Sequence, residues 1–231
     1  MQLSKRLTAA AHMVTKGSRL ADVGCDHGYI PIALVTEGHV PYAVAMDVNQ
    51  GPLERARQNI EQFAAAQYIE TRLSDGVAAL RPGEVDSIII AGMGGNLMMR
   101  ILEDGRDVLK ETKEMILQPQ SEIAGVRRYL QEHGYQILDE EMVLEDGKYY
   151  MMMKVIHGHM EYEKEIFFEY GKILLEKQHP VLREFLYKKL GTAEKICEKI
   201  AANRGEGSCE RIKEIKKEMQ KISSALDYYD M

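Results

Sequence analysis

Between residues 19 and 133, short apolar runs alternate with amphipathic stretches, and this alternation limits the possible folds more than any other feature of the sequence. It predicts strands at 19–23, 43–47, 69–73, 87–90 and 115–117, and helices at 29–36, 51–66, 96–104 and 121–133. Strands that alternate with helices form a parallel sheet that is covered on both faces. We therefore expect an α/β fold, preceded by a helix within residues 1–15.

Two further strands are predicted at 136–144 and 149–155. They are joined by Glu145-Asp146-Gly147-Lys148, in which Asp-Gly is typical of a hairpin turn. A dinucleotide-binding fold would continue here with strand–helix units, whereas the Rossmann-like fold of class I methyltransferases closes with an antiparallel hairpin. Residues 1–159 are therefore expected to form one domain, a parallel sheet with a terminal antiparallel hairpin.

The chain changes character at residue 160, beyond which nearly every stretch up to residue 202 is helical in pattern. Apolar residues at spacings of three and four recur in two segments, Leu186, Leu190, Ala193, Cys197 and Ile200, and Ile212, Ile215, Met219, Ile222 and Leu226. This spacing is typical of a coiled-coil seam, and the loop at 203–208 allows the two helices to pair antiparallel. We expect residues 160–231 to form a second, α-helical domain that contains a coiled-coil hairpin.

Composition sets looser limits. The 231 residues, 45% of them hydrophobic, suffice for one α/β domain and a smaller appendage. A net charge of −6 argues weakly against a nucleic-acid partner, but local patches decide such binding because salt screens distant charges. The spacing of Cys25, Cys197 and Cys209 fits neither a zinc site nor a disulfide framework. We therefore expect no metal. A signal-peptide core and apolar runs of membrane length are also missing, so we expect a cytoplasmic protein.

The first strand runs into Asp22-Val23-Gly24-Cys25-Asp26-His27-Gly28-Tyr29, a strand–turn–helix signal. Its glycines allow a ligand to approach the backbone, but the spacing D-x-G-x-x-x-G differs from the dinucleotide fingerprint G-x-G-x-x-G. Carboxylates would repel a pyrophosphate and would suit the ammonium and sulfonium of S-adenosylmethionine. The candidate contacts are Asp22, Gly24, Asp26, His27 and Gly28; the alternative is a tight turn with solvated acids.

Acidic residues also follow the second and third strands. Asp47, with Val48 after it, stands 19 residues beyond Gly28, where an acid can accept hydrogen bonds from both ribose hydroxyls. Asp75 and Gly76 follow the third strand, where a carboxylate can accept from the adenine amine of the cofactor. A helix N-cap or turn explains Asp75 equally well on local evidence.

The fourth strand ends in Ala91-Gly92-Met93-Gly94-Gly95-Asn96, at the point where the strand order of such a sheet reverses. Glycines there let the backbone approach the methyl group or the target base, which makes Gly92 a candidate contact. Enzymes that methylate the adenine amine often carry Asn-Pro-Pro-aromatic at this position, and its absence favours a ring nitrogen as the nucleophile. After the fifth strand, Gln118 could bond a base edge or simply end the strand.

These motifs together resemble those of the bacterial tRNA (adenine(22)-N1)-methyltransferases, the TrmK family. The matching segments span the chain: Leu3-Ser4-Lys5-Arg6-Leu7, Asp22 to Pro31, Gly92-Met93-Gly94-Gly95, Leu117-Gln118-Pro119 and the C-terminal helical hairpin. The resemblance implies a class I methyltransferase domain with a coiled-coil domain and tRNA as substrate. It implies methyl transfer from S-adenosylmethionine to N1 of adenine 22, which leaves S-adenosylhomocysteine. We expect the protein to be a monomer.

The resemblance also suggests roles for residues around the reacting atoms. Methylation makes the adenine cationic, so a carboxylate nearby would stabilise the transition state; Asp26 is the candidate, and Met93 is a second candidate catalytic residue. Candidate substrate contacts are Lys5, Arg6, Tyr29, Gly94, Asn96 and Gln118.

Three other interpretations stay open at the level of sequence. A methyltransferase of the same class could act on another RNA, a small molecule or a protein, although the helical appendage disfavours a small substrate. A nicotinamide-dependent oxidoreductase is opposed by the glycine spacing and the terminal hairpin. A non-catalytic RNA-binding protein with a vestigial fold is opposed by the retained acids Asp22, Asp47 and Asp75.

Overall fold

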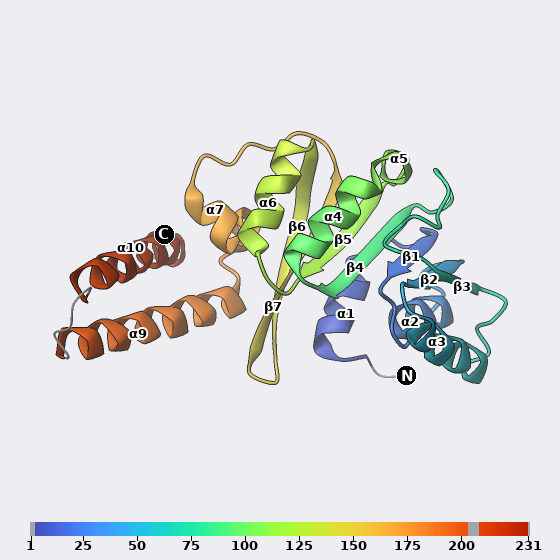
Figure 1. The fold of residues 1–231 in the computed structure, drawn as a ribbon, viewed down its shortest axis with the longest axis horizontal. Helices are drawn as coiled ribbons and strands as arrows, with labels where there is room; N and C mark the ends of the chain where they lie inside the picture. The colour runs from blue at the N-terminus through green and yellow to red at the C-terminus, as the bar shows by residue number, and fades with distance from the viewer. Residues whose placement is uncertain (1–2, 203–207, 231) are drawn as a thin grey trace. The chain divides into compact units, whose positions relative to one another are not determined.

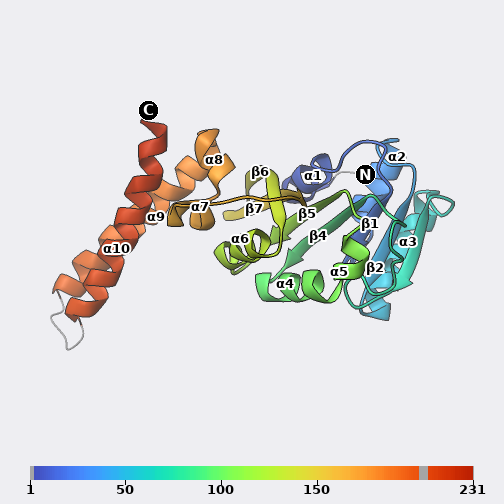
Figure 2. The same ribbon diagram turned by 90° about the horizontal axis from the view of Figure 1, so that it is seen from above.

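The computed structural model describes residues 3–202 and 208–230. The chain divides into two compact units, Met1–Glu161 and Tyr162–Met231, and each is described by itself (Figures 1 and 2). The division lies close to the boundary predicted after residue 159. No helix of the described residues has the length and apolar character needed to cross a membrane.

A single sheet organises the first unit, and its described strands follow the order β3-β2-β1-β4-β5-β7-β6. The strands are β1 (Leu20–Val23), β2 (Ala43–Asp47), β3 (Ile69–Leu73), β4 (Ser87–Met93), β5 (Glu114–Pro119), β6 (Tyr135–Glu145) and β7 (Lys148–His157). The first five pair in parallel, and β7 runs antiparallel to both β5 and β6. The predicted parallel sheet with a terminal hairpin is therefore confirmed.

Helices cover both faces of this sheet. They are α1 (Lys5–His12), α2 (Tyr29–Thr36), α3 (Gln50–Gln62), α4 (Gly95–Asp104), α5 (Arg106–Leu109) and α6 (Ile123–Glu132). Figure 2 shows α1 and α2 on one face and α4 and α6 on the other. The chain returns to the centre at β4 and winds outward the other way, so right-handed crossovers place α4 and α6 on the opposite face from α2.

Most predicted boundaries hold to within two residues, and the two largest differences have identifiable reasons. The helix predicted at 51–66 ends at Gln62, because Ala64 adopts a left-handed φ of 54° and the Ala65 amide bonds back to the Ile60 carbonyl. The strand predicted at 87–90 continues to Met93 through a register shift between Ala91 and Met93. The short helix α5 was not predicted.

In the second unit, the described helices are α7 (Glu165–Tyr170), α8 (Lys172–Glu176), α9 (Pro180–Ala202), α10 (Ser208–Leu226) and η1 (Asp227–Tyr229). α9 and α10 pack side by side (Figure 1). Leu186, Ala193, Ile215 and Ile222, all from the predicted seam, are buried. The coiled-coil geometry stays a prediction, and the predicted loop at 203–208 falls almost entirely outside the described residues.

A buried ion pair fixes α6 to the terminal hairpin. The Arg127 guanidinium lies 2.8 Å from the Glu140 carboxylate, and both side chains are fully buried. Two charges removed from water in this way stabilise the fold only as a pair, because either one alone would be left uncompensated in an apolar environment.

We therefore expect Arg127→Met to lower the free energy of unfolding by about 3–5 kcal/mol, since it leaves the Glu140 carboxylate without its guanidinium. Urea denaturation followed by circular dichroism measures the difference. The control is Lys110→Met, which removes an exposed ion pair with Asp107 and should cost less than about 0.5 kcal/mol. Equal losses in the two variants would contradict the role given to the buried pair.

Candidate active site

A cavity of about 350 Å³ opens at the carboxyl ends of β1, β4 and β5. It is lined by Arg6, Leu7, Asp22, Gly24, Cys25, Asp26, His27, Tyr29, Ile30, Ala91, Gly92 and Gln120. The cavity therefore brings together the first-strand motif and the fourth-strand glycine loop, which are far apart in sequence. Adjacent parallel strands with opposite winding leave such a crevice at their carboxyl ends.

The turn between β1 and α2 is tightly constrained. Gly24 has a φ of 75°, and a side chain there would collide with the Met93 methyl group. The amides of Gly24 and Cys25 both donate to the Met46 carbonyl, at 2.8 and 2.9 Å. These bonds turn the chain directly beneath the cavity, where only glycine leaves room for a ligand above the backbone.

The Asp22 carboxyl group lies at the base of the cavity with 4% of its residue surface exposed. Burial raises the pKa of Asp22 to about 7, and the nearby charge of Asp47 adds to the shift. Among the described residues, no side chain or amide donates a hydrogen bond to this carboxyl group. A cation placed beside it would relieve both the desolvation and the repulsion, which fits the ammonium of S-adenosylmethionine.

The ends of β2 and β3 offer the remaining groups for a nucleoside. One Asp47 oxygen accepts from the Asn49 amide at 2.9 Å, which orients the carboxylate and leaves its other oxygen for a ligand. Val48 is 58% exposed and offers an apolar surface to an adenine ring. The Asp75 side chain is 71% exposed and lies 3.3 Å from the Arg100 guanidinium. These residues lie outside the lining of the cavity, and their contacts with ribose and adenine stay predictions.

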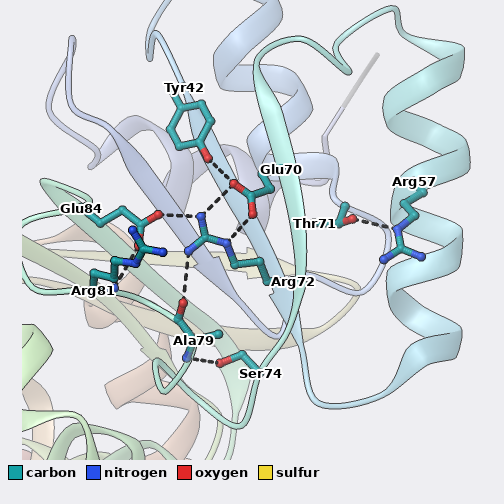
Figure 3. Close-up of polar contacts among 9 residues, drawn as sticks. All are labelled: Tyr42, Arg57, Glu70, Thr71, Arg72, Ser74, Ala79, Arg81 and Glu84. Carbon is teal, nitrogen blue, oxygen red and sulfur yellow. Dashed lines mark hydrogen bonds and ion pairs between the residues drawn. The ribbon is translucent and has the colours of Figure 1, made fainter.

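A network around Arg72 of β3 holds the loop that carries Asp75 and Gly76 (Figure 3). The Arg72 guanidinium binds Glu70 at 2.6 Å, Glu84 at 2.5 Å and the Ala79 carbonyl at 3.1 Å. The Ser74 hydroxyl donates to the Gly76 carbonyl and accepts from the Ala79 amide. The loop is thus fixed from both sides by groups that need not touch a ligand.

Asp26 lies in a left-handed conformation with φ of 45°, and its side chain is 56% exposed. One of its oxygens accepts from Arg55 of α3 at 2.6 Å, and the other lies 3.4 Å from the His27 imidazole. The His27 ring stacks on Tyr29, with centroids 5.0 Å apart and planes inclined by 8°. The carboxylate is thus shared between two cationic or polar neighbours at the mouth of the cavity.

Gln118 is fully buried within β5. Its side-chain oxygen accepts from the Arg6 guanidinium at 2.9 Å and from the Gly92 amide at 3.0 Å, and its nitrogen donates to the Pro119 carbonyl. The predicted contact of Gln118 with a base edge is at odds with this burial. Gln118 instead positions Arg6, which also lies over the Tyr150 ring at 5.4 Å.

Other predicted residues lie beside the cavity rather than in it. Met93 packs against Gly24, and because a thioether carries no titratable proton, we assign Met93 to packing instead of catalysis. Gly94 precedes α4 and lies close to Ser121, and Asn96 is exposed in the first turn of α4. Lys5 lines a different cavity of about 830 Å³ between α1, α2 and the terminal hairpin, which contains none of the cofactor motifs.

Sequence reasoning missed three residues that shape the site: Arg55, Arg72 and Gln120. Arg55 and Arg72 act through ion pairs that depend on how α3 and β3 pack, and no local pattern marks them. Gln120 stands two positions after Gln118 and directly follows the end of β5, and this position could have indicated it.

No group of three or more His, Cys, Asp or Glu side chains in the described residues is arranged to hold a metal ion.

Carboxylates and glycines gather at the carboxyl ends of β1, β2 and β4, as in methyltransferases. A model of the methyltransferase domain matches residues 3–153. The helical unit lies beyond this match. A tRNA (adenine(22)-N(1))-methyltransferase of Bacillus subtilis (strain 168) is 30% identical over 238 aligned positions, which cover 99% of this chain and 98% of the relative. The chain belongs to this family.

Solved structures agree with this assignment. Streptococcus pneumoniae Sp1610, a candidate tRNA (m1A22) methyltransferase in complex with S-adenosyl-L-methionine, is 34% identical with a TM-score of 0.84, and the match covers 97% of this chain and 100% of that protein. TrmK of M. capricolum, in complex with S-adenosyl-homocysteine, is 26% identical with a TM-score of 0.84, and the match covers 99% of both chains.

Asp22→Asn tests the buried carboxyl group through two opposite effects. Loss of the negative charge should weaken binding of S-adenosylmethionine at least about tenfold, measured by calorimetry at pH 8. The ligand-free protein should become more stable at pH 8, by roughly 2–4 kcal/mol, because the ionised carboxylate no longer has to be buried.

The sign of the pH dependence follows from the raised pKa. Wild-type stability is lost as the pH rises from the ordinary value near 3.8 to the folded value of about 7, so the gain from Asp22→Asn should shrink toward pH 4. Wild-type affinity for the cationic cofactor should fall as the pH drops below 7. Unchanged cofactor affinity in the variant would refute this assignment of Asp22.

Proposed function

We propose that this protein transfers the methyl group of S-adenosylmethionine to N1 of adenine 22 in tRNA. The observation that carries the proposal is the full-length likeness to a tRNA (adenine(22)-N(1))-methyltransferase, which extends through both units of the chain. The missing Asn-Pro-Pro-aromatic motif after β4 also supports a ring nitrogen as the target. The protein would act on tRNA in the cytoplasm, as a monomer.

The cofactor supplies an electrophilic methyl group on a sulfonium. We assign its ammonium to Asp22, its ribose hydroxyls to the free oxygen of Asp47, and its adenine to Val48, Asp75 and Gly76. The turns at Gly24, Gly28 and Gly92 would place backbone against the ligand, and His27 would close the mouth. All these residues lie at the carboxyl ends of β1 to β4 or in the loops that follow.

In folded tRNA, the N1 atom of the target adenine is engaged in base contacts, so the base must be exposed or flipped before it can react. The stacked rings of His27 and Tyr29 offer a platform for such a base, because Tyr29 is 37% exposed at the mouth of the cavity. Arg6 would hold the phosphate or base on the opposite side, oriented by Gln118. Catalysis would then come mainly from alignment of N1 with the methyl group.

Asp26 has the charge needed to stabilise the adenine cation that forms on methylation. Arg55 and His27 share this charge, so we propose that Asp26 acts electrostatically and orients His27, without removing a proton from the base. Asp22 is buried, whereas the Asp26 side chain is 56% exposed, and this difference leaves Asp26 as the carboxylate on the substrate side.

Nucleoside mass spectrometry tests the function directly. Purified protein is incubated with S-adenosylmethionine and unmodified tRNA that carries either adenine or guanine at position 22. We expect N1-methyladenosine only from the first tRNA. N6-methyladenosine, methylation at another position, or no product would contradict the proposal.

For the substrate-side carboxylate, we expect Asp26→Asn to lower the rate of methyl transfer about 10- to 100-fold while cofactor affinity changes less than about threefold. Single-turnover transfer and calorimetry measure the two quantities. The control is Asp107→Asn. It alters an exposed carboxylate of α5 that pairs with Lys110, the C-cap of this helix, and should change neither the rate nor the affinity. Loss of cofactor binding in Asp26→Asn would move this residue to the cofactor side.

A further inference from the structure

Methylation at N1 restricts how an enzyme can recognise adenine, and this restriction rests on the function proposed above. The N1 lone pair has to face the methyl group, so no donor can occupy it. The exocyclic N6 amine is then the one group on that edge left for recognition, and it requires a hydrogen-bond acceptor. The cavity must therefore offer an acceptor that no other protein group has already engaged.

Most polar groups around the mouth fail this requirement. The Gln118 oxygen already accepts from Arg6 and from the Gly92 amide. The Asp26 carboxylate is held by Arg55 and His27. Arg6 carries donors and no acceptor.

Gln120 meets it. It follows β5 directly, is exposed and lines the cavity. Its backbone amide donates to the Met93 carbonyl at 2.8 Å, which fixes the residue to the end of β4. Within the described residues, its side-chain amide has no hydrogen-bond partner.

The Gln120 amide also lies at the wall where the substrate would enter. A Cβ atom on Gly92 would lie 3.7 Å from the Gln120 side-chain nitrogen and 3.5 Å from the Arg6 guanidinium. The two side chains thus converge on one glycine, which has a φ of 82° and no side chain of its own to fill the space. An adenine edge over Gly92 would have the Gln120 amide beside its amine, and a half-turn of this exposed amide presents its oxygen in place of its nitrogen.

We propose that Gln120 recognises the target adenine, with its side-chain oxygen accepting a hydrogen bond from N6 while N1 stays free to react. The N1 lone pair forms a bond to the methyl carbon, and the carbon–sulfur bond breaks with its electron pair going to sulfur. The positive charge passes to the adenine and spreads onto N6, and Gln120 takes no proton. Its hydrogen bond strengthens as that charge develops, so it contributes to the rate as well as to binding.

The experiment compares two tRNAs, one with adenosine and one with purine riboside at position 22, made by ligation of synthetic fragments. Purine riboside keeps N1 but lacks the amine. Gln120→Ala should lower kcat/KM on the adenosine tRNA about 10- to 100-fold, mainly through kcat, and change it less than about threefold on the purine tRNA. The ratio between variants cancels the difference in nucleophilicity between the two bases.

A conservative variant and a control complete the design. Gln120→Glu retains an acceptor and should recover most of the activity on adenosine that Gln120→Ala loses. Gln62→Ala, at the exposed end of α3, should match wild type on both tRNAs, and all variants should bind S-adenosylmethionine equally.

Equal losses on both tRNAs in Gln120→Ala would overturn the proposal, because the residue would then act without contacting N6; a backbone carbonyl of β4 would be the acceptor instead. Failure of the wild type to methylate the adenosine tRNA would refute the proposed function itself. The two failures are therefore distinguishable.

Discussion

Asp22 places a carboxyl group with 4% exposure at the end of a central parallel strand, close enough to Asp47 for the two charges to repel. Such an arrangement lowers the stability of the ligand-free protein, because a buried ionised acid without a partner is unfavourable. The fold tolerates it at a site where a cation can bind. Asp22 ends β1, which lies between β2 and β4 in the sheet. These two neighbouring strands present other groups for the ligand.

A layer of supporting contacts surrounds the residues assigned to ligands. Gln118 ties Arg6 to the Gly92 amide, Arg55 holds Asp26, and Arg72 fixes the loop that carries Asp75. The burial of these supports differs: Gln118 is fully enclosed, whereas the Arg55 side chain is 49% exposed. A bond inside the sheet is hardly screened, while the exposed pair is weakened by water and salt. The hydrogen bonds of Gln118 are therefore less weakened by solvent than the ion pair between Arg55 and Asp26.

Local patterns in the sequence were sufficient for much of this arrangement. β2, β3 and α2 have the predicted bounds, and Asp22, Gly24 and Gly92 meet in one cavity because carboxyl ends of parallel strands share an edge. The end of α3 was missed because a left-handed alanine, not a glycine, terminates it. For Gln118 the sequence allows a base contact or the end of a strand, and the structure extends β5 to Pro119 with Gln118 buried in it. The pairing of Arg55 with Asp26 depends on tertiary packing, and no periodicity encodes it.

The end of β4 also explains why N1 rather than N6 suits this site. The N6 lone pair is delocalised into the ring, so an enzyme that methylates the amine must bind both of its hydrogens to release that pair. N1 already has an in-plane lone pair and needs only alignment. In this chain the end of β4 offers glycine backbone with φ of 82° at Gly92, and the Gly92 amide is already bound to Gln118. The acceptor that Gln120 offers is enough to orient the base, and it leaves the amine too weakly held to become the nucleophile.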